Sequence, residues 1–528
     1  MLYLSFWLLL ILTTYFSTET LAKFVELPFF KQYGSNYETK RELTASVIND
    51  ISFYQISMNI GSDMQPNNLL VDTGSSDSFL LSSQFNFSTS STFHNNNSEF
   101  LVNYGSGTVT GFWGKDLISL NGQSIGKLSF GITKNSSVDM GLLGLGLSGL
   151  ESTYSNSLDT SYQYSNFPIM LKENGCIDAT IFHVFLGEET SATGTFLFGA
   201  VDTSKAKNGV FYELPMINTE NSIKYDTPIK YIITVQGMGT IVSTKKTSIT
   251  TTKQAALIDT GSTLTMVNSF ILDSIMDNLN AQSNSNGFYS VSCNTDDNIV
   301  VDFGGFQINI PVNQTFIGHD GDQCFIGIAS TAMETMIFGD TFIRAMSIVF
   351  DLDNYVIGIA EANFNDELSA IVNSSGGIPN GVKAIGYNDT YVSYSEPVSG
   401  GNIFSTNSLT RALNSVNGHS NSFSSTGLSS RLLTTSSSSE KEEISSTNSI
   451  TFKNPSVITS TTSATTKISY SLSKSIHSSN IIFSSSNMSI ETSTSAAQLT
   501  NSTSTKQKNG SLKIMQNFLL IFISSLLL

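Results

Sequence analysis

The chain has 528 residues, with 42 acidic and 26 basic side chains and a formal net charge of −16. This charge argues against a nucleic-acid partner, since phosphate binding needs clustered Lys and Arg. The five histidines are scattered and no His-Glu-x-x-His run occurs, which argues against a zinc protease. We therefore expect no metal and no cofactor.

The first 22 residues are predicted to be a signal peptide, because the apolar run Phe6–Leu12 is followed by a small-residue exit. A membrane-spanning anchor is the alternative, but this run is too short to cross a bilayer. The basic pair Lys40-Arg41 is typical of a processing site. Residues 23–41 are therefore predicted to be a short propeptide, although such a pair can also be ordinary surface.

Two short stretches of the chain read alike: Leu70–Ser76 and Leu257–Thr263 each run from an apolar strand end into Asp-Thr-Gly and two hydroxyl residues. Two carboxyl groups about 3 Å apart cannot both ionise, so one keeps a proton while the other is charged. The charged group can take a proton from water, and the protonated one can polarise a peptide carbonyl. Asp72 and Asp259 are therefore the predicted catalytic pair.

The neighbours of both aspartates fit the same chemistry. Glycine lets backbone amides approach a carboxylate closely. A threonine hydroxyl can bond across to the other loop, and a serine can donate to its own aspartate. The alternative is a pair of unrelated strand-to-turn corners. The predicted supporting residues are Thr73, Gly74, Ser75, Thr260, Gly261 and Ser262.

Short strand-like runs such as Phe53–Ile60 recur to about residue 360 and are separated by Gly, Asn and Asp. Helical periodicity is scarce, and Ser269–Leu279 is the clearest short helix. A stretch of about 320 residues is long enough to bury two cores. This pattern predicts an all-β protein with two lobes.

Further segments follow in a specific order, three of them after the first loop and one after the second. They are Tyr104-Gly105-Ser106-Gly107, Asp139–Gly146, Phe196–Asp202 and Ile337–Arg344, which leads into Val349–Leu352. With these segments the chain resembles the pepsin-type aspartic proteases over roughly residues 50–365, and most closely the fungal yapsin and candidapepsin branch.

The resemblance implies a bilobal pepsin-like fold with the active site in a cleft between an N-terminal lobe, 42–205, and a C-terminal lobe, 206–365. It implies that Tyr104, Gly105 and Ser106 form a flap that closes over the substrate. It also implies a second-lobe disulfide between Cys293 and Cys324. Cys176 is then left over, and a buried free thiol is favoured over a reactive or intermolecular one.

The chain also departs from the family pattern. Phe79 stands where such enzymes usually carry a Trp that bonds the flap tyrosine, so the support of the flap must differ. Ser106 stands where the yapsin-like branch often carries Asp, which weakens the implied preference for basic residues at the cleavage site. The cysteine pair common in the first lobe is absent.

The composition changes near residue 366, and residues 403–509 are dominated by Ser, Thr and Asn. Such a segment buries too little apolar surface to fold, so 366–509 is predicted to be a disordered, O-glycosylated stalk. The apolar end Phe518–Leu528 after Asn509-Gly510-Ser511 predicts a GPI-attachment signal over 510–528. Asn509 is the predicted attachment residue, and Asn501 is a rival.

The sequence thus predicts a secreted, monomeric aspartic endopeptidase that cleaves proteins or peptides at acid pH. We expect it at the cell surface, held by a GPI lipid anchor in the membrane or linked to wall glucan. The alternative is a catalytically silent, protease-like wall glycoprotein or adhesin. The predicted N-glycosylation sites are Asn86, Asn96, Asn135, Asn313, Asn373 and Asn388.

Overall fold

A computed structural model of the chain describes residues 23–33, 52–104, 107–136, 140–155, 162–220, 225–284, 287–365 and 368–405. The predicted signal peptide, the Lys40-Arg41 pair, the flap-tip residues Gly105 and Ser106, the stalk beyond residue 405 and Asn509 lie outside these residues. None of the helices in the described ranges is long and apolar enough to span a membrane.

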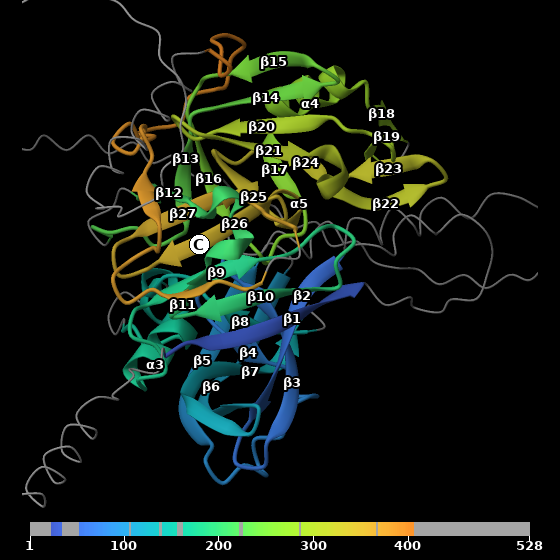
Figure 1. The fold of residues 1–528 in the computed structure, drawn as a ribbon. Helices are drawn as coiled ribbons and strands as arrows, with labels where there is room; N and C mark the ends of the chain where they lie inside the picture. Colours follow the sequence, from blue (N-terminus) through green and yellow to red (C-terminus); the bar gives the residue numbers. More distant parts are fainter. Residues whose placement is uncertain are drawn as a thin grey trace, which may run out of the picture. The chain divides into compact units, whose positions relative to one another are not determined.

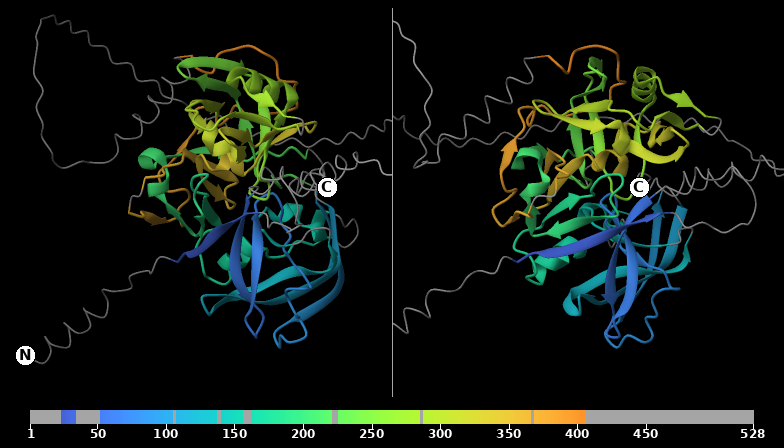
Figure 2. Two further views of the ribbon diagram at one scale, coloured as in Figure 1. Left: turned by 90° about the vertical axis from the view of Figure 1, so that its right-hand side faces the viewer. Right: turned by 45° about the vertical axis from the view of Figure 1, so that its right-hand side comes forward.

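The described chain is mostly β-strand, which confirms the predicted all-β, two-lobe fold (Figures 1 and 2). One 14-stranded sheet runs in the order β29-β12-β27-β26-β9-β10-β1-β2-β3-β8-β4-β7-β6-β5. Its first-lobe strands are β2 (Ser52–Ile60), β3 (Gln65–Asp72), β4 (Phe79–Leu80), β5 (His94–Tyr104), β6 (Gly107–Leu120), β7 (Gln123–Ser136) and β8 (Gly141–Gly144). The strands between the lobes are β1 (Val25–Tyr33), β9 (Ile181–Phe185), β10 (Thr193–Phe198), β12 (Phe211–Pro215), β26 (Met346–Asp351), β27 (Val356–Glu361) and β29 (Gly381–Lys383).

The second lobe is built from three smaller sheets. The first contains β13 (Ile232–Val235), β16 (Gln254–Ile258), β25 (Thr335–Phe338), β17 (Thr265–Asn268) and β24 (Ile328–Thr331). The second contains β15 (Lys245–Thr250), β14 (Gly237–Val242), β20 (Asn298–Asp302) and β21 (Gln307–Pro311). The third contains β18 (Gln282–Ser283), β19 (Tyr289–Ser292), β23 (Gln323–Ile326) and β22 (Phe316–Asp320). A separate pair joins β11 (Ala200–Asp202) to β28 (Ile371–Asn373).

Helices in the described ranges are few and short. The α-helices are α2 (Ser152–Ser155), α3 (Phe167–Glu173), α4 (Ser269–Leu279) and α5 (Asp340–Ile343), and the 3-10 turns are η1 (Ser148–Leu150), η2 (Thr203–Lys205), η3 (Lys207–Gly209) and η4 (Val312–Thr315). The predicted helix over Ser269–Leu279 is confirmed as α4. The Asn268 side chain accepts a hydrogen bond from the Phe270 amide at its start, and Asn280 ends it in the left-handed conformation.

Both strands that lead into the Asp-Thr-Gly loops have a parallel partner. Strand β3 pairs with β8, and β16 pairs with β25. All five side chains of β16 are buried. This burial explains the continuous apolar run before the second loop, since a strand covered on both faces needs no polar alternation. The two lobes therefore present their loops from equivalent strand ends.

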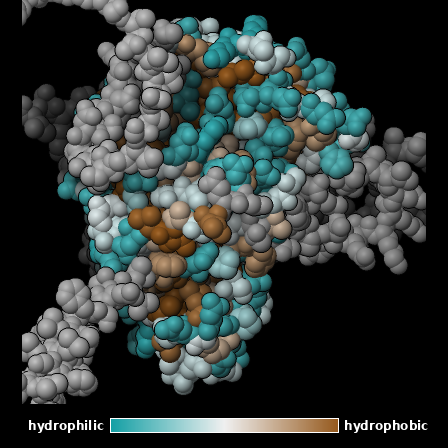
Figure 3. Space-filling model, viewed as in Figure 1, coloured by the Kyte–Doolittle hydropathy of each residue, from teal (hydrophilic) through white to brown (hydrophobic). Residues whose placement is uncertain are grey.

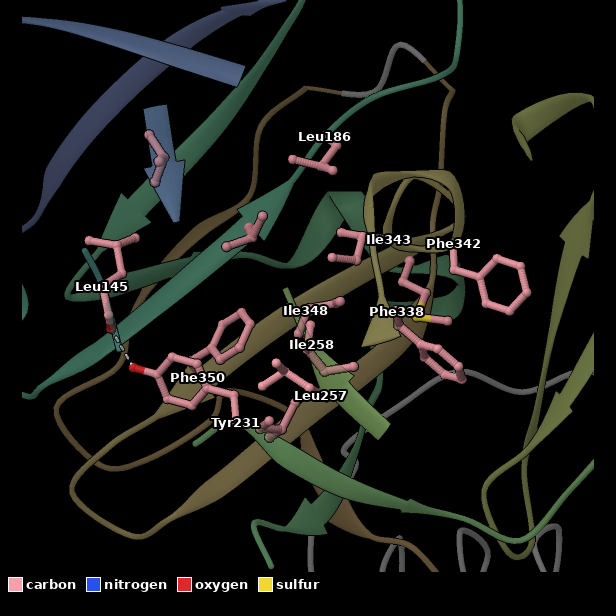
Figure 4. Packing of buried hydrophobic residues seen from close by; sticks show 14 of the residues in the cluster. Leu145, Leu186, Tyr231, Leu257, Ile258, Phe338, Phe342, Ile343, Ile348 and Phe350 are labelled. Atoms are coloured by element: carbon pink, nitrogen blue, oxygen red, sulfur yellow. Dashed lines mark hydrogen bonds between the residues drawn. The ribbon is translucent and has the colours of Figure 1, made fainter. Parts of the chain in front are cut away.

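One hydrophobic core includes Val71 and Ile258, the residues that directly precede the two aspartates, and Figure 4 shows part of this core. Leu145, from the first lobe, contacts this core together with Tyr231 and Phe350, whose rings lie 4.7 Å apart. The Tyr231 hydroxyl donates a hydrogen bond of 2.6 Å to the Leu145 carbonyl (Figure 4). On the outside, polar residues cover much of the face drawn in Figure 3, with smaller hydrophobic patches between them.

The folded part extends beyond the predicted boundary at residue 365. Strands β28 and β29 lie within residues 368–405, and Ile378 and Ile403 are buried, with Ile403 2% exposed. The prediction of a disordered stalk from residue 366 is therefore wrong for this stretch. The Ser- and Thr-rich composition that motivated it dominates only further along the chain, whereas residues 368–405 still supply apolar side chains to the core.

The segment predicted to be a propeptide contains β1, which lies between β10 and β2 in the large sheet. Leu27 and Phe29 point into the core and are each 2% exposed. Lys31 is buried as well, and its ammonium donates to the backbone carbonyl of Glu189 and lies 3.6 Å from the carboxylate of that residue. Strand β1 is thus an integral part of the described sheet.

Candidate active site

The two Asp-Thr-Gly loops meet through reciprocal hydrogen bonds between their threonines. The Thr73 hydroxyl donates to the Ile258 carbonyl at 2.8 Å and accepts from the Thr260 amide at 3.0 Å. In the same way, the Thr260 hydroxyl donates to the Val71 carbonyl at 2.8 Å and accepts from the Thr73 amide at 3.1 Å. All four bonds are buried, so this cross-loop lattice fixes the two aspartates relative to each other.

Asp72 is fully buried at the end of β3. The Gly74 amide donates to its Oδ1 at 2.7 Å, and the Ser75 hydroxyl donates to its Oδ2 at 2.5 Å. Hydrogen bonds to a carboxylate stabilise the charged form. The loop thus supplies two donors to one carboxyl group.

Asp259 directly follows β16 and is also fully buried. The Gly261 amide donates to its Oδ1 at 2.9 Å, and the Ser262 hydroxyl donates to its Oδ2 at 2.7 Å. A Cβ atom at position 261 would lie 2.4 Å from Oδ1 of Asp72. Glycine is therefore required there, because any side chain would collide with the opposite carboxyl group.

The two carboxyl groups lie close enough together to influence each other's ionisation, so they titrate as a pair. Burial raises the pKa of both groups. The negative charge of Asp72 adds to the effect of burial on Asp259 and holds the pKa of Asp259 well above its ordinary value. One proton is therefore retained between the two groups over a range of pH in which separate carboxyl groups would both be charged.

The flap hairpin is formed by β5 and β6, with Tyr104 paired to Gly107 across its end. The Tyr104 side chain is buried, and its ring lies 5.8 Å from that of Phe79. Trp113, on β6, packs in the same hydrophobic cluster. Its ring lies 5.0 Å from that of Phe100.

A second pair of buried carboxyl groups lies near the first Asp-Thr-Gly loop, and sequence reasoning did not single it out. Asp77 accepts hydrogen bonds from the Tyr164 hydroxyl at 2.7 Å and from the Ser152 amide at 2.8 Å. Glu151 accepts from the Tyr164 amide at 2.8 Å, and burial raises the pKa of Glu151 to about 9. The one local signal was a carboxyl residue, Asp77, directly after the first copy of the duplicated motif.

The predicted disulfide between Cys293 and Cys324 is present. Cys176 is free and half-buried rather than fully buried, and its thiol donates to the Ile125 carbonyl at 3.5 Å. Burial raises the pKa of the Cys176 thiol, which disfavours the reactive thiolate. The described ranges contain no cluster of three or more His, Cys, Asp or Glu side chains that could hold a metal ion.

Most of the predicted glycosylation sites that the structure describes are open to solvent. Asn86, Asn96, Asn313 and Asn388 are exposed, and Asn373 is half-exposed. The side chain of Asn135 lies outside the described residues. Use of these sites remains a prediction.

Comparison with known proteins agrees with the geometry. Residues 53–362 match the family of eukaryotic aspartyl proteases. The chain is 36% identical to aspartic proteinase yapsin-3 of Saccharomyces cerevisiae over 415 residues, which covers 73% of this chain and 82% of that protein. It is 33% identical to aspartic proteinase MKC7 of the same yeast, with 72% and 80% covered, and 33% identical to secreted aspartic protease 9 of Candida albicans, with 56% and 55% covered. The chain therefore belongs to the eukaryotic aspartyl protease family and is an aspartic-type peptidase of the pepsin kind, related to the yapsins and candidapepsins.

Proposed function

We propose that this protein is an acid endopeptidase in which Asp72 and Asp259 together activate a water molecule against a peptide bond. The observation that carries the proposal is the cross-loop lattice of threonine hydrogen bonds, which holds the two buried carboxyl groups in contact. Such a pair keeps one proton and one negative charge, the combination that general acid–base hydrolysis needs.

In the proposed reaction, Asp72 is charged and Asp259 carries the shared proton. Asp72 takes a proton from the water as its oxygen attacks the carbonyl carbon, and Asp259 donates its proton to the carbonyl oxygen. The resulting diol collapses when Asp72 passes its proton to the leaving nitrogen. In the same collapse the C–N bond breaks and one hydroxyl of the diol gives its proton to Asp259, so that a carboxylic acid and an amine leave and the pair is restored without a covalent intermediate.

The flap residues Tyr104, Gly105 and Ser106 are proposed to cover the bound peptide and exclude water from the site. A buried tyrosine at the end of β5 and its pairing with Gly107 support this role for the hairpin. A preference for basic residues at the cleavage site is the finer proposal. The similarity to the yapsins favours this preference. Ser106 weakens it, because a serine side chain carries no charge that could select a basic residue of the substrate.

Replacing either aspartate tests the proposal. Asp72→Asn and Asp259→Asn should each lower peptide cleavage at acid pH by at least about a hundredfold, the order expected for losing a general acid or base. Asp302→Asn is the matched control, because Asp302 is a buried carboxyl group in β20 of the second lobe. Activity within tenfold of the parent in either loop variant, with contamination excluded, would reject the assignment.

We further propose that the enzyme is secreted, glycosylated and held at the cell surface by a GPI anchor attached at Asn509. The apolar chain end and the similarity to a relative named secreted aspartic protease 9 support this proposal. A phosphatidylinositol-specific phospholipase should release the enzyme from membranes, unless it is linked to wall glucan. Detection of the peptide Phe518–Leu528 in the mature protein by mass spectrometry would refute the anchor.

A further inference from the structure

The hydroxyl of Tyr104 is buried at the base of the flap hairpin and has no hydrogen-bond partner among the described residues. The side chain is 7% exposed, so the missing partner cannot be bulk water. The ring packs against Phe79, which carries no polar atom. A buried hydroxyl without a partner is unfavourable, and most such groups in proteins are paired with a side chain or an ordered water.

A small cavity of about 20 Å³ lies between the first Asp-Thr-Gly loop and the flap strand. Its lining includes Ser75 and Asp77 on one side, and Val102 and Tyr104 on the other. One water molecule needs roughly 10–15 Å³ of such space, together with at least two polar partners. The cavity therefore has the size and the polar lining for one bridging water.

Asp77 is held in place by two hydrogen bonds and still has room for another. Its two oxygens each accept one bond, from the Tyr164 hydroxyl and from the Ser152 amide. A carboxylate offers about four acceptor positions, so further positions remain. After burial, the Asp77 charge is the largest influence that holds the pKa of Tyr104 well above its ordinary value. The Tyr104 hydroxyl consequently keeps its proton and can act as a donor.

We propose that Asp77 accepts the hydrogen bond of the Tyr104 hydroxyl through one water molecule in this cavity, and that it thereby positions the flap. We call this water-mediated connection between Tyr104 and Asp77 the anchor of the flap. It continues through Tyr164, whose ring lies 5.2 Å from that of Trp113 in the β6 strand of the same hairpin. The consequence for catalysis rests on the proposed function, in which the flap covers the substrate. Asp77 is a positioning residue, because it acts through Tyr104 rather than on the peptide bond.

The first test is a double-mutant cycle with Asp77→Asn and Tyr104→Phe, measured as kcat and KM on one peptide substrate. Each single variant should lower kcat/KM by about three- to tenfold, the factor that one ordinary hydrogen bond is worth. The kcat/KM of the double variant should be no lower than that of the less active single variant, because both substitutions disrupt the same bridged hydrogen bond. Effects that multiply would overturn the proposal. Asp302→Asn is the control and should stay within twofold.

The second test does not depend on activity, so it separates the anchor from the proposed function. Amide hydrogen exchange is followed over residues 99–104 and 107–112, the two flap strands. If the hydroxyl is anchored, Tyr104→Phe speeds exchange there severalfold, and Asp77→Asn does the same. If the hydroxyl is instead unpaired, Tyr104→Phe removes an unfavourably buried polar group, and exchange should be unchanged or slower. Unchanged or slower exchange in this variant would therefore refute the anchor.

These two tests distinguish the possible failures. A parent enzyme that cleaves no peptide would refute the proposed function, while the exchange measurement would still judge the anchor. Should Asp77→Asn fail to fold, Tyr104→Phe decides alone, since it removes one oxygen and keeps the ring against Phe79. Tyr164→Phe gives an independent check, because it removes the hydrogen bond that the Tyr164 hydroxyl donates to Asp77. This variant should also speed exchange in the same strands.

Discussion

The lattice between the two catalytic loops makes a quantitative prediction for Thr260→Val. Valine has nearly the shape of threonine, but it loses the hydroxyl that donates to the Val71 carbonyl and accepts from the Thr73 amide. Two buried hydrogen bonds contribute about 1 kcal/mol each, and a buried donor left unpaired costs about 1–3 kcal/mol. The free energy of unfolding should therefore fall by about 3–5 kcal/mol.

Calorimetry is the suitable assay. The entropy of unfolding is about 2.1 cal/mol/K per residue, so for the roughly 350 residues that the structure describes this loss corresponds to a fall in Tm of about 4–7 °C. Thr260→Ser is the matched control, since it keeps the hydroxyl and loses one methyl group, about 0.8 kcal/mol or 1 °C. Peptide cleavage should fall in Thr260→Val more than in Thr260→Ser. A Thr260→Val protein at least as stable as Thr260→Ser would show that the lattice does not join the loops as described.

Three further predictions follow from burial. Because the folded-state pKa of Glu151 is about 9 and thus above its unfolded value, the folded protein binds the extra proton, and stability falls as pH rises from about 4.5 to 9. The free energy of unfolding, measured with urea between pH 7 and 9, should depend on pH less steeply in Glu151→Gln than in the parent, by about 1.4 kcal/mol per pH unit. An unchanged dependence on pH would contradict this pKa. A chain that ends at residue 365 should be far less stable than one that ends at 405, because it lacks β29 and the buried Ile403; equal Tm values would show that the extension is dispensable. Pepstatin should shift or quench the emission of Trp113, the one indole after residue 22, and Trp113→Phe should abolish the signal; an unchanged spectrum at confirmed inhibition would separate Trp113 from the flap.

The parts of the fold that could be predicted from sequence are those with a local or repeated pattern. Helix α4 has an apolar stripe at helical spacing and Asn at both ends, and its bounds were predicted to the residue. The duplicated Asp-Thr-Gly loops predicted a facing pair, and the structure brings the loops together through Thr73 and Thr260. In these cases the residues that define the structure are also neighbours in the chain.

The contacts that escaped prediction depend on tertiary structure. The bond between Tyr164 and Asp77 joins positions 87 residues apart and leaves no periodic trace in the sequence. Strand β1 does alternate apolar residues, with Leu27 and Phe29 on its buried face. That pattern was outweighed by the basic pair that follows it. The predicted propeptide, residues 23–41, thus contains a structural strand, and composition alone cannot decide between the two roles.

The position of β1 has a consequence for maturation. Its backbone pairs with β10 on one edge and with β2 on the other, so its departure would leave unpaired amide and carbonyl groups on two strands in the middle of the sheet. Cutting the chain after Arg41 and losing residues 23–41 are therefore separate events. Cleavage opens one peptide bond outside the described strands. Dissociation requires either a substitute strand in the same position or a sheet divided between β10 and β2, so native mass spectrometry of the processed enzyme should distinguish the nicked form from the trimmed one.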